Sequence, residues 1–254
     1  MKIIGIIPAR YASTRFPGKP LAKIQDRSMI EWVYRRAVKV FPHTAVATDD
    51  ERIANEVKHF GGTVVMTSPA HATGTDRCAE ALLKLQQLYG ETADVVVNIQ
   101  GDEPFVDAGL LLQLANCFED DTVDIATAVR KITDEHELFN PNCVKAVVSA
   151  TGRAMYFSRS TIPHLRGTEQ SEWLSRHDFY LHLGLYAYRA DVLAQLTQLP
   201  PSTLEKAESL EQNRWLENDY RIKVIPTKAG SFSIDTPEDL QYAQQWLETH
   251  PMYL

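Results

Sequence analysis

The sequence predicts an α/β fold with a mostly parallel central sheet, and three observations support this prediction. Short apolar runs typical of buried strands alternate with helical patterns through the first half of the chain. Three polar clusters, at residues 8–19, 67–77 and 100–102, each come directly after an expected strand. Parallel sheets bind their ligands at these strand ends. The second half is less regular and richer in strands. We therefore expect a Rossmann-like sheet flanked by helices, with a smaller β-rich insertion.

In the first half, apolar runs predict strands and periodic segments predict helices. Ile30, Val33 and Ala37, for example, share one face of an expected helix. Gly61-Gly62 ends the next helix. The same rules place strands at 3–7, 44–47, 64–66 and 95–99, and helices at 29–40, 51–60 and 76–88. This βα order implies a parallel sheet with right-handed crossovers.

The second half gives strands at 124–130, 144–149, 181–188 and 222–226. A capping box at residues 202–205 precedes an expected helix at 207–218. Thr236 and Pro237 start a last helix, as a cap followed by proline at the first position. The polar stretch 158–180, which contains Trp173, is a long connection typical of a lid, an interface arm or a binding loop.

Composition bounds the class of protein. The 254 residues allow one large domain, or a domain with a sizeable insertion, and the net charge of −7 disfavours nucleic-acid binding. Cys78, Cys117 and Cys143 show no C-x-x-C spacing, which argues against a disulfide framework or a zinc ribbon. The sequence shows neither a signal-peptide pattern nor an apolar run of about 18 residues. We expect a cytoplasmic protein without nucleic-acid or membrane partners.

The first polar cluster lies in the stretch IIPARYASTRFPGKPL, residues 6–21. Arg10, Arg15 and Lys19 alternate there with small residues, so that cations and backbone N–H groups could bind a polyphosphate. Pro20 after Gly18-Lys19 excludes a Walker A loop, and the lack of G-x-G-x-x-G disfavours a dinucleotide fold. A surface loop with solvated charges is the alternative interpretation.

Asp102 follows the strand ending in Gln100-Gly101, where the glycine permits a sharp turn. A carboxylate at a strand end beside a phosphate loop is a natural Mg²⁺ ligand. A turn aspartate that binds nearby backbone is the alternative. Asp235, just before the last helix, could likewise be no more than an acid at a helix start.

Two further clusters are candidates for binding. The stretch TSPAHATGTDR, residues 67–77, offers the hydroxyl donors of Ser68, Thr73 and Thr75, close approach at Gly74 and the charge of Arg77. A helix cap explains Thr75 and the residue after it equally well. His182 and Tyr186 are four residues apart on an expected strand and therefore share a face, with Gly184 leaving room between them. Satisfied core side chains are the alternative for this pair.

These stretches, together with QGDEP, SIDTPEDL, YFSRSTIP, HLGLYAYR and SLEQNRWLE, resemble the sugar nucleotidyltransferases. Within them the chain is most similar to the 3-deoxy-manno-octulosonate cytidylyltransferases, the CMP-Kdo synthetases of Gram-negative bacteria. The resemblance spans residues 6–240, with Asn213 standing where the family more often has leucine. It implies that CTP and 3-deoxy-D-manno-octulosonate (Kdo) react to CMP-Kdo and pyrophosphate, for lipopolysaccharide synthesis.

The resemblance also implies roles for individual residues. Lys19, Arg10, Asp102 and Asp235 would be catalytic, and the two aspartates would hold Mg²⁺. The implied nucleotide-binding set is Pro8, Ala9, Arg10, Ser13, Arg15, Lys19, Ser68, Thr73, Gly74, Arg77, Gln100 and Asp102. The implied sugar-binding set is Gln100, Arg159, His182, Tyr186, Glu211 and Gln212, with Arg214 in the same stretch.

Residues 1–130 would then be the mainly CTP-binding half of a single nucleotidyltransferase domain. Residues 131–230 would bind the sugar and carry the contact of a homodimer. Activation of 8-amino-Kdo or another acid sugar is an alternative within the same class, with sialic acid less favoured. A non-catalytic nucleotide-binding module is the alternative from another class, but it would not need paired carboxylates.

Overall fold

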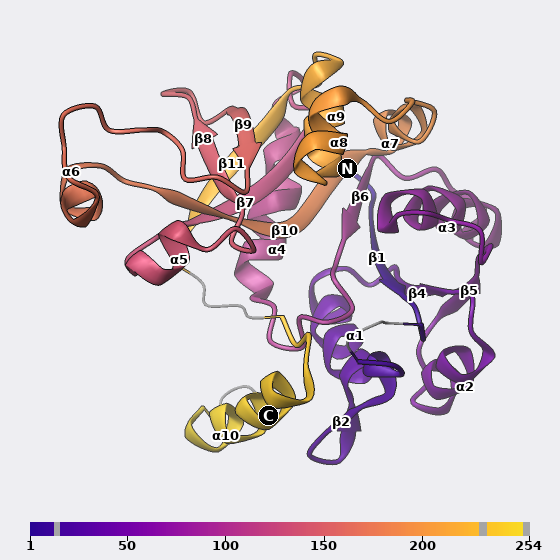
Figure 1. Cartoon of the computed structure of the whole chain (residues 1–254). Helices are drawn as coiled ribbons and strands as arrows, with labels where there is room; N and C mark the ends of the chain where they lie inside the picture. Colours follow the sequence, from indigo (N-terminus) through magenta and orange to yellow (C-terminus); the bar gives the residue numbers. More distant parts are fainter. Residues whose placement is uncertain (13–15, 229–232, 251–254) are drawn as a thin grey trace. The chain divides into compact units, whose positions relative to one another are not determined.

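The computed structural model describes residues 1–12, 16–228 and 233–250 (Figure 1). The chain divides into two compact units, Met1–Leu112 with Gly230–Leu254 and Gln113–Ala229. Strand β7 (Ile125–Lys131) belongs to the second unit, where it pairs with β10 and β11. The assignment of residues 1–130 as the mainly CTP-binding half stays a prediction.

The first unit contains the parallel sheet that the sequence predicts. Its strands follow the order β6-β1-β4-β5, and every neighbouring pair is parallel. The central positions are fully buried, as in strands covered on both faces. The strands are β1 (Ile3–Ala9), β4 (Thr44–Thr48), β5 (Val64–Met66) and β6 (Val95–Asn98), and a separate two-stranded ribbon is formed by β2 (Lys23–Ile24) and β3 (Arg27–Ser28).

Helices α1, α2 and α3 of this unit contact its strands, as the predicted alternation requires. A smaller cluster joins α1 to α10, with Met29 and Trp32 against Ala243 and Leu247 and with Ile234 in the same core. The C-terminal segment therefore packs beside the start of the chain. The helices are α1 (Met29–Val40), α2 (Glu51–His59), α3 (Gly74–Tyr89), α10 (Pro237–Thr249) and, spanning the boundary, α4 (Ala108–Asn116), with short turns η1 (Lys19–Leu21) and η2 (Cys117–Glu119).

The second unit is β-rich and mixed. Strand β7 pairs in parallel with β11 and antiparallel with β10, which bulges between Leu183 and Tyr186. Strand β8 pairs antiparallel with both β10 and β9. The bounds of β10 (Tyr180–Arg189), β11 (Ile222–Thr227) and β8 (Lys145–Val148) confirm three predicted strands, whereas β9 (Ala154–Ser158) was not predicted.

The expected helix at 207–218 is confirmed in its C-terminal part by α9, but its start was placed too early. The predicted capping box of Ser202 and Glu205 does start a helix, but that helix ends at Glu208 because Ser209 takes the left-handed conformation with φ of 53°. The helices of this unit are α5 (Glu135–Phe139), α6 (Trp173–Arg176), α7 (Ala190–Leu196), α8 (Thr203–Glu208) and α9 (Glu211–Glu217), with the turn η3 (Gln170–Glu172).

The long connection between β9 and β10 is folded. Trp173 is 3% exposed and packs with Ile132, Leu138 and Phe179 in a core of its own. Its ring stacks on Phe179 with centroids 5.9 Å apart. The segment that ends in α6 therefore has a fixed internal structure (Figure 1).

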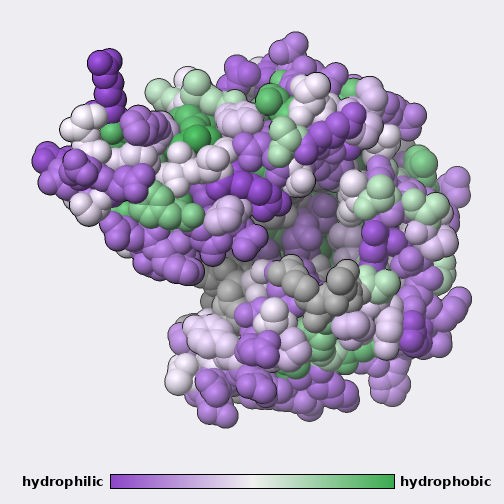
Figure 2. All heavy atoms as spheres, viewed as in Figure 1, coloured by the Kyte–Doolittle hydropathy of each residue, from purple (hydrophilic) through white to green (hydrophobic). Residues whose placement is uncertain are grey.

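Hydrophilic residues cover most of the face shown in Figure 2, and hydrophobic residues lie there in small separate patches. Exposed apolar side chains such as Leu88 and Met155 belong to different elements, which is usual for a protein surface. Among the described residues, no helix combines the length and the apolar character needed to cross a bilayer.

Candidate active site

The centre of the candidate site is Lys19, whose ammonium lies between two carboxylates of the first unit. Lys19 Nζ is 2.6 Å from Asp102 Oδ2 and 3.1 Å from Asp235 Oδ1. The aspartates are 133 positions apart in the chain, yet both contact the same nitrogen. The structure thus brings together three of the residues that the resemblance marked as catalytic.

Local backbone structure explains the position of Lys19. Gly18 adopts the left-handed conformation with φ of 74°, and a Cβ there would lie 3.1 Å from the Tyr11 ring. Its N–H donates to the carbonyl of Tyr11, and the Arg52 guanidinium lies 3.3 Å from the centre of the same ring. Gly18 therefore lies against Tyr11, and Lys19 follows it at the start of the short turn η1.

Asp102 follows β6 in a tight turn in which the N–H of Glu103 donates to the carbonyl of Gln100. Gly101 is needed here for a close approach rather than for an unusual φ. A Cβ at this position would lie 3.0 Å from the carbonyl oxygen of Pro8, at the end of the neighbouring strand β1. The glycine lets the ends of the two strands come together, which places Asp102 beside the first loop.

Asp235 reaches the same place because the segment before α10 is fixed at both ends. The N–H of Ile234 donates to the carbonyl of Asp102 at 2.9 Å, and the Ile234 side chain is buried. Thr236 and Asp239 form a capping box at the start of α10. Asp239 is therefore part of the helix start, and the carboxylate of Asp235 contacts Lys19.

The three charges stabilise one another. Burial lowers the pKa of Lys19, but Asp102 and Asp235 raise it more strongly, so that the pKa lies above its usual value and the side chain is a cation. Its side chain is 13% exposed, against 27% and 34% for the two aspartates. The two carboxylates are close enough to share one cation, and both are partly exposed. They could therefore also hold Mg²⁺, which binds one or two protein carboxylates together with phosphate oxygens.

A depression of about 210 Å³ lies against this cluster. It is lined by residues of the first loop and of the turn after β6: Pro8, Ala9, Arg10, Ala12, Lys19, Pro20, Gln100, Gly101 and Asp102. Six of these belong to the nucleotide-binding set that the resemblance implies. Ser13 and Arg15, also in that set, lie outside the described residues.

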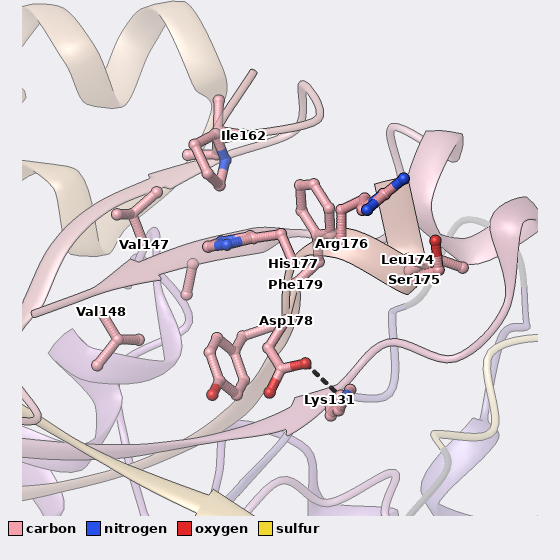
Figure 3. Close-up of a pocket in the computed structure, with 13 residues that line it drawn as sticks. Lys131, Val147, Val148, Ile162, Leu174, Ser175, Arg176, His177, Asp178 and Phe179 are labelled. Carbon is pink, nitrogen blue, oxygen red and sulfur yellow. Dashed lines mark ion pairs between the residues drawn. The ribbon is translucent and has the colours of Figure 1, made fainter. Parts of the chain in front are cut away.

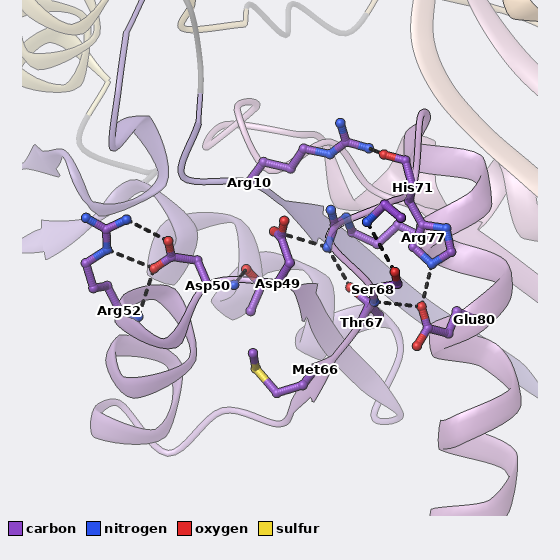
Figure 4. A network of polar contacts seen from close by, with 12 residues as sticks. Arg10, Asp49, Asp50, Arg52, Met66, Thr67, Ser68, His71, Arg77 and Glu80 are labelled. Carbon is purple, nitrogen blue, oxygen red and sulfur yellow. Dashed lines mark hydrogen bonds and ion pairs between the residues drawn. The ribbon is translucent and has the colours of Figure 1, made fainter.

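The second polar loop is joined to the first through Arg10 (Figure 4). Arg10 NH2 donates to the carbonyls of His71 and Thr73 at 2.5 and 3.3 Å. Glu80 of α3 binds the His71 ring and accepts from the N–H of Ser68 at 2.8 Å. These contacts hold the loop 67–73 in one conformation.

Glu80 is strongly held as an anion. Burial raises the pKa of its carboxyl group, but hydrogen bonds from Lys84, the Ser68 N–H and His71 outweigh this and bring the pKa to about 2. The sequence did not indicate a role for His71 or Glu80. The two residues are nine positions apart, one in a loop and one in a helix, and this spacing is not typical of a metal or ligand site. Their role in the structure is to shape the loop.

The predicted nucleotide contact of Arg77 stays a prediction, and the structure places its side chain inside the first unit. Arg77 is fully buried, with NH1 2.6 Å from Thr67 Oγ1 and 3.2 Å from Asp49 Oδ1. Burial lowers the pKa of its guanidinium, and Asp49 opposes that effect. Its Nε and NH2 have no hydrogen-bond partner among the described residues (Figure 4).

Thr73 and Gly74 lie at the start of α3, and Ser68 lies in the loop that precedes it. Thr73 is the N-cap, with Asp76 completing a capping box, and the helix begins at Gly74. Ser68 Oγ accepts from the N–H of Ala70 at 3.1 Å. The helix-cap alternative thus accounts for Thr73, and roles in nucleotide binding stay predictions for all three.

In the second unit, His182 and Tyr186 are neighbours, as their spacing on one strand predicted, with ring centroids 5.3 Å apart. His182 is partly exposed as a residue, but its ring lies against the rings of Phe157 and Tyr186. Burial lowers the pKa of His182 to about 3. The imidazole is therefore neutral at physiological pH. Thr127 Oγ1 donates to the Leu185 carbonyl and so accepts from His182 Nε2, which leaves Nδ1 as an acceptor.

Tyr186 is 8% exposed, and its hydroxyl has no hydrogen-bond partner among the described residues. Burial raises the pKa of Tyr186 well above its usual value, and Tyr188 and Glu211 add to this effect. Its ring packs edge-on against Trp215 of α9 with centroids 5.0 Å apart. This contact connects β10 to the helix that carries the predicted residues Glu211 and Gln212.

The predicted sugar-binding residues of helix α9 differ from one another in their exposure to solvent. Gln212 is 6% exposed, whereas Glu211 is partly exposed. Arg214 is occupied structurally, with Nε 2.7 Å from Glu205 Oε2. Asn213, which stands where the family more often has leucine, is fully buried. Its side-chain amide donates to the Phe157 carbonyl at 2.9 Å and so connects α9 to strand β9.

Arg159 lies just after β9 and contacts three carbonyl groups. Nε donates to Glu208 O at 2.7 Å, NH1 to Pro141 O at 3.2 Å and NH2 to Ser209 O at 3.4 Å. The first and last of these carbonyls belong to the C-terminus of α8, where a helix attracts a cation. The guanidinium is thus held in a fixed orientation.

A separate hollow of about 500 Å³ in the second unit lies between β8 and the folded connection (Figure 3). Val147, Val148, Ile162 and Leu174 give it apolar walls, and Asp178 and Lys131 form an ion pair at one side. None of the predicted sugar-binding residues lines it.

Comparison with known proteins agrees with these features. Residues 4–223 match the model of a family described as Cytidylyltransferase. The chain is 55% identical over 251 residues to a 3-deoxy-manno-octulosonate cytidylyltransferase of Parabacteroides distasonis, covering 97% of this chain and 98% of the relative. The corresponding protein of Bacteroides thetaiotaomicron is 51% identical over 251 residues, covering 98% and 99%.

A solved structure gives the same result. A CMP:2-keto-3-deoxy-manno-octonic acid synthetase in complex with CTP matches with a TM-score of 0.90 and 37% identity, covering 98% of this chain and 100% of that chain. The match extends over both units, which confirms the predicted fold class. The chain belongs to the cytidylyltransferase family, and the predicted likeness to the 3-deoxy-manno-octulosonate cytidylyltransferases is confirmed.

Proposed function

We propose that the protein is a cytidylyltransferase that activates Kdo with CTP, giving CMP-Kdo and pyrophosphate. The observation that carries the proposal is the meeting of Asp102 and Asp235 at the ammonium of Lys19. A module that only binds a nucleotide has no need of two carboxylates brought from distant parts of the chain to one cation. The names of the relatives support CTP and Kdo as the substrates.

In the proposed reaction the C2 hydroxyl of Kdo attacks the α-phosphorus of CTP in line. A C–O–P bond forms, the bond to pyrophosphate breaks, and the hydroxyl proton is lost to solvent. Such a transfer depends on alignment and charge neutralisation more than on covalent help. Arg10 and Lys19 would neutralise the triphosphate, with Lys19 acting on the charge that develops at the α-phosphate. No side chain stands out as a dedicated base.

Asp102 and Asp235 would hold one or two Mg²⁺ ions, and the donor set fits this role. Both carboxylates are partly exposed, and they already share one cation. Among the described residues there is no cluster of three or more metal-ligating side chains, so phosphate oxygens and water would complete the coordination. When bound, the metal neutralises phosphate charge and lowers the pKa of the attacking hydroxyl.

The acid sugar would be held by residues of the second unit. Arg159 would bind its carboxylate, because a guanidinium can donate to both carboxylate oxygens at once. The neutral His182 would accept from a sugar hydroxyl at Nδ1, and the buried hydroxyl of Tyr186 would gain a partner. Glu211, Gln212 and Gln100 would complete the recognition of sugar hydroxyl groups.

The direct test is pyrophosphate release by the purified protein with CTP and Mg²⁺, measured in parallel with Kdo, 8-amino-Kdo and sialic acid. We expect release with Kdo only when all three components are present. Preference for 8-amino-Kdo would reassign the sugar within the same class. The protein would instead be a non-catalytic nucleotide-binding module if no acid sugar led to pyrophosphate release and if calorimetry showed CTP binding that does not depend on Mg²⁺.

We further propose a cytoplasmic homodimer that supplies CMP-Kdo for lipopolysaccharide synthesis, as the resemblance implies. The apolar side chains of Val147, Val148 and Leu174, which line the open hollow beside the folded connection, are suited to a contact between copies (Figure 3). Sedimentation velocity at micromolar concentration should give the mass of a dimer. A single species with the mass of one chain would contradict the dimer and leave the proposed reaction intact.

A further inference from the structure

Lys145, in strand β8, is a lysine with no solvent exposure at all. Its ammonium donates to the carbonyls of Asn140 and Cys143 at 2.9 and 2.6 Å, and it forms no ion pair among the described residues. A buried cation without a counter-charge is costly and rare. The fold therefore keeps this charge at a stability cost, which directs attention to what the ammonium holds in place.

The ammonium holds the turn Asn140–Cys143. The turn is closed by the N–H of Cys143, which donates to the Asn140 carbonyl at 3.1 Å, and by the N–H of Asn142, which donates to Asn140 Oδ1 at 2.9 Å. Lys145 binds the carbonyls at both ends of the turn. Within the turn, the carbonyl of Pro141 accepts from NH1 of Arg159 at 3.2 Å. One turn thus links the two cations.

The contacts of Arg159 leave a defined pair of donors. A guanidinium has five N–H groups. One on each nitrogen is taken by the carbonyls of Glu208, Pro141 and Ser209, so that two remain among the contacts of residues 1–12, 16–228 and 233–250, one on each terminal nitrogen. Those two nitrogens can donate to both oxygens of one carboxylate. The Pro141 carbonyl is one of the three contacts that fix this orientation.

Within the described part of the chain, neither Lys145 nor Arg159 is paired directly with a carboxylate. Glu208, the nearby acid, accepts instead from the hydroxyl of Ser158 at 2.6 Å and from the backbone N–H of Arg159 at 2.9 Å. Burial lowers the pKa of Lys145, Cys143 and Glu208 raise it, and Arg159 lowers it, so the two cations interact. An incoming carboxylate would be attracted by both charges.

From this geometry we infer that Lys145 is a positioning residue for the acid sugar: it fixes the turn Asn140–Cys143, whose Pro141 carbonyl orients Arg159 toward the substrate carboxylate. The inference rests on the proposed function, in which Arg159 binds that carboxylate. Lys145 does not touch the substrate and takes no part in the chemical step. Its effect should therefore appear in the binding of the sugar and not in that of the nucleotide.

The test is steady-state kinetics of Lys145→Met and Lys145→Gln. The KM for Kdo should rise about tenfold in Lys145→Met, the effect of one weakened charge-assisted hydrogen bond. The KM for CTP should change by less than about twofold, because the nucleotide does not use this contact. Lys145→Gln, which keeps a donor for the turn, should lie between Lys145→Met and the wild type. Lys206→Met, an exposed lysine of α8, is the matched control and should leave both KM values unchanged.

A double-mutant cycle shows whether Lys145 acts through Arg159. In an Arg159→Ala background, Lys145→Met should add little to the KM for Kdo, because the guanidinium that it positions is gone. Equal increases in both backgrounds would overturn the inference, as would an unchanged KM for Kdo in an active enzyme. If circular dichroism shows that both Lys145 variants are unfolded, the residue serves stability alone and the inference fails. A wild-type protein that makes no CMP-Kdo would instead refute the proposed function.

Discussion

Replacing Asp102 or Asp235 by asparagine should lower kcat by at least about 100-fold, the scale on which loss of one transition-state charge contact reduces turnover. Each variant keeps the size of the side chain but removes half of the negative charge that now meets at Lys19. Mg²⁺ prefers charged oxygen ligands, so each variant should also need much higher Mg²⁺ for its residual activity. Steady-state rates measured over a range of Mg²⁺ concentrations test both effects.

The control for these variants is Glu238→Gln, an exposed acid three positions from Asp235 at the start of α10. It removes the same charge from the same segment but lies outside the cluster around Lys19. Its kcat should stay near the wild-type value. A rate close to wild type in either aspartate variant, with circular dichroism showing an intact fold, would remove that carboxylate from the proposed metal site.

Lys19→Ala should lower kcat by about 100-fold or more while raising the KM for CTP only a few-fold. The reason is that Lys19 is proposed to neutralise charge that develops at the α-phosphate during transfer, whereas Arg10 also contributes to ground-state binding of the triphosphate. The same variant leaves Asp102 and Asp235 together without their shared cation, so its melting temperature should fall when no metal is added.

Lys23→Ala is the matched control for this variant. Lys23 belongs to the same part of the chain, but its side chain is exposed, and within the described residues its ammonium makes only a long contact of 3.5 Å with the Asp26 carbonyl. Both its kcat and its KM for CTP should match the wild type. If Lys19→Ala changes the KM for CTP alone and leaves kcat intact, Lys19 is a binding residue and its proposed role in the transition state is wrong.

Regular elements of the fold were predictable because their signals are local. Met29–Val40 and Val64–Met66 have the bounds that periodicity and apolar runs indicate. The start of the helix expected at 207–218 was misplaced because no glycine marks the break between α8 and α9, where Ser209 takes a left-handed conformation that serine rarely adopts. Strand β9, with the sequence AMYFS, was missed because it shows no regular alternation of polar and apolar residues.

The candidate site was predictable in its residues but not in its contacts. Motifs and strand ends indicated Lys19, Asp102 and Asp235 one by one. The contact of both aspartates with the ammonium of Lys19 depends on long-range packing, which these local signals do not show. The burial of Arg77 against Thr67 and the carbonyl contacts of Lys145 were equally hidden. A charged residue in a sequence indicates a solvated or ligand-binding side chain, and only tertiary structure shows that it is enclosed.

The most direct test of the central claim is a crystal structure of the protein with Mg²⁺ and CTP. The account predicts a metal ion coordinated by the carboxylates of both Asp102 and Asp235, with the ammonium of Lys19 moved from between them to the triphosphate. An ion bound elsewhere, with Lys19 still bridging the two aspartates while the nucleotide is in place, would contradict it.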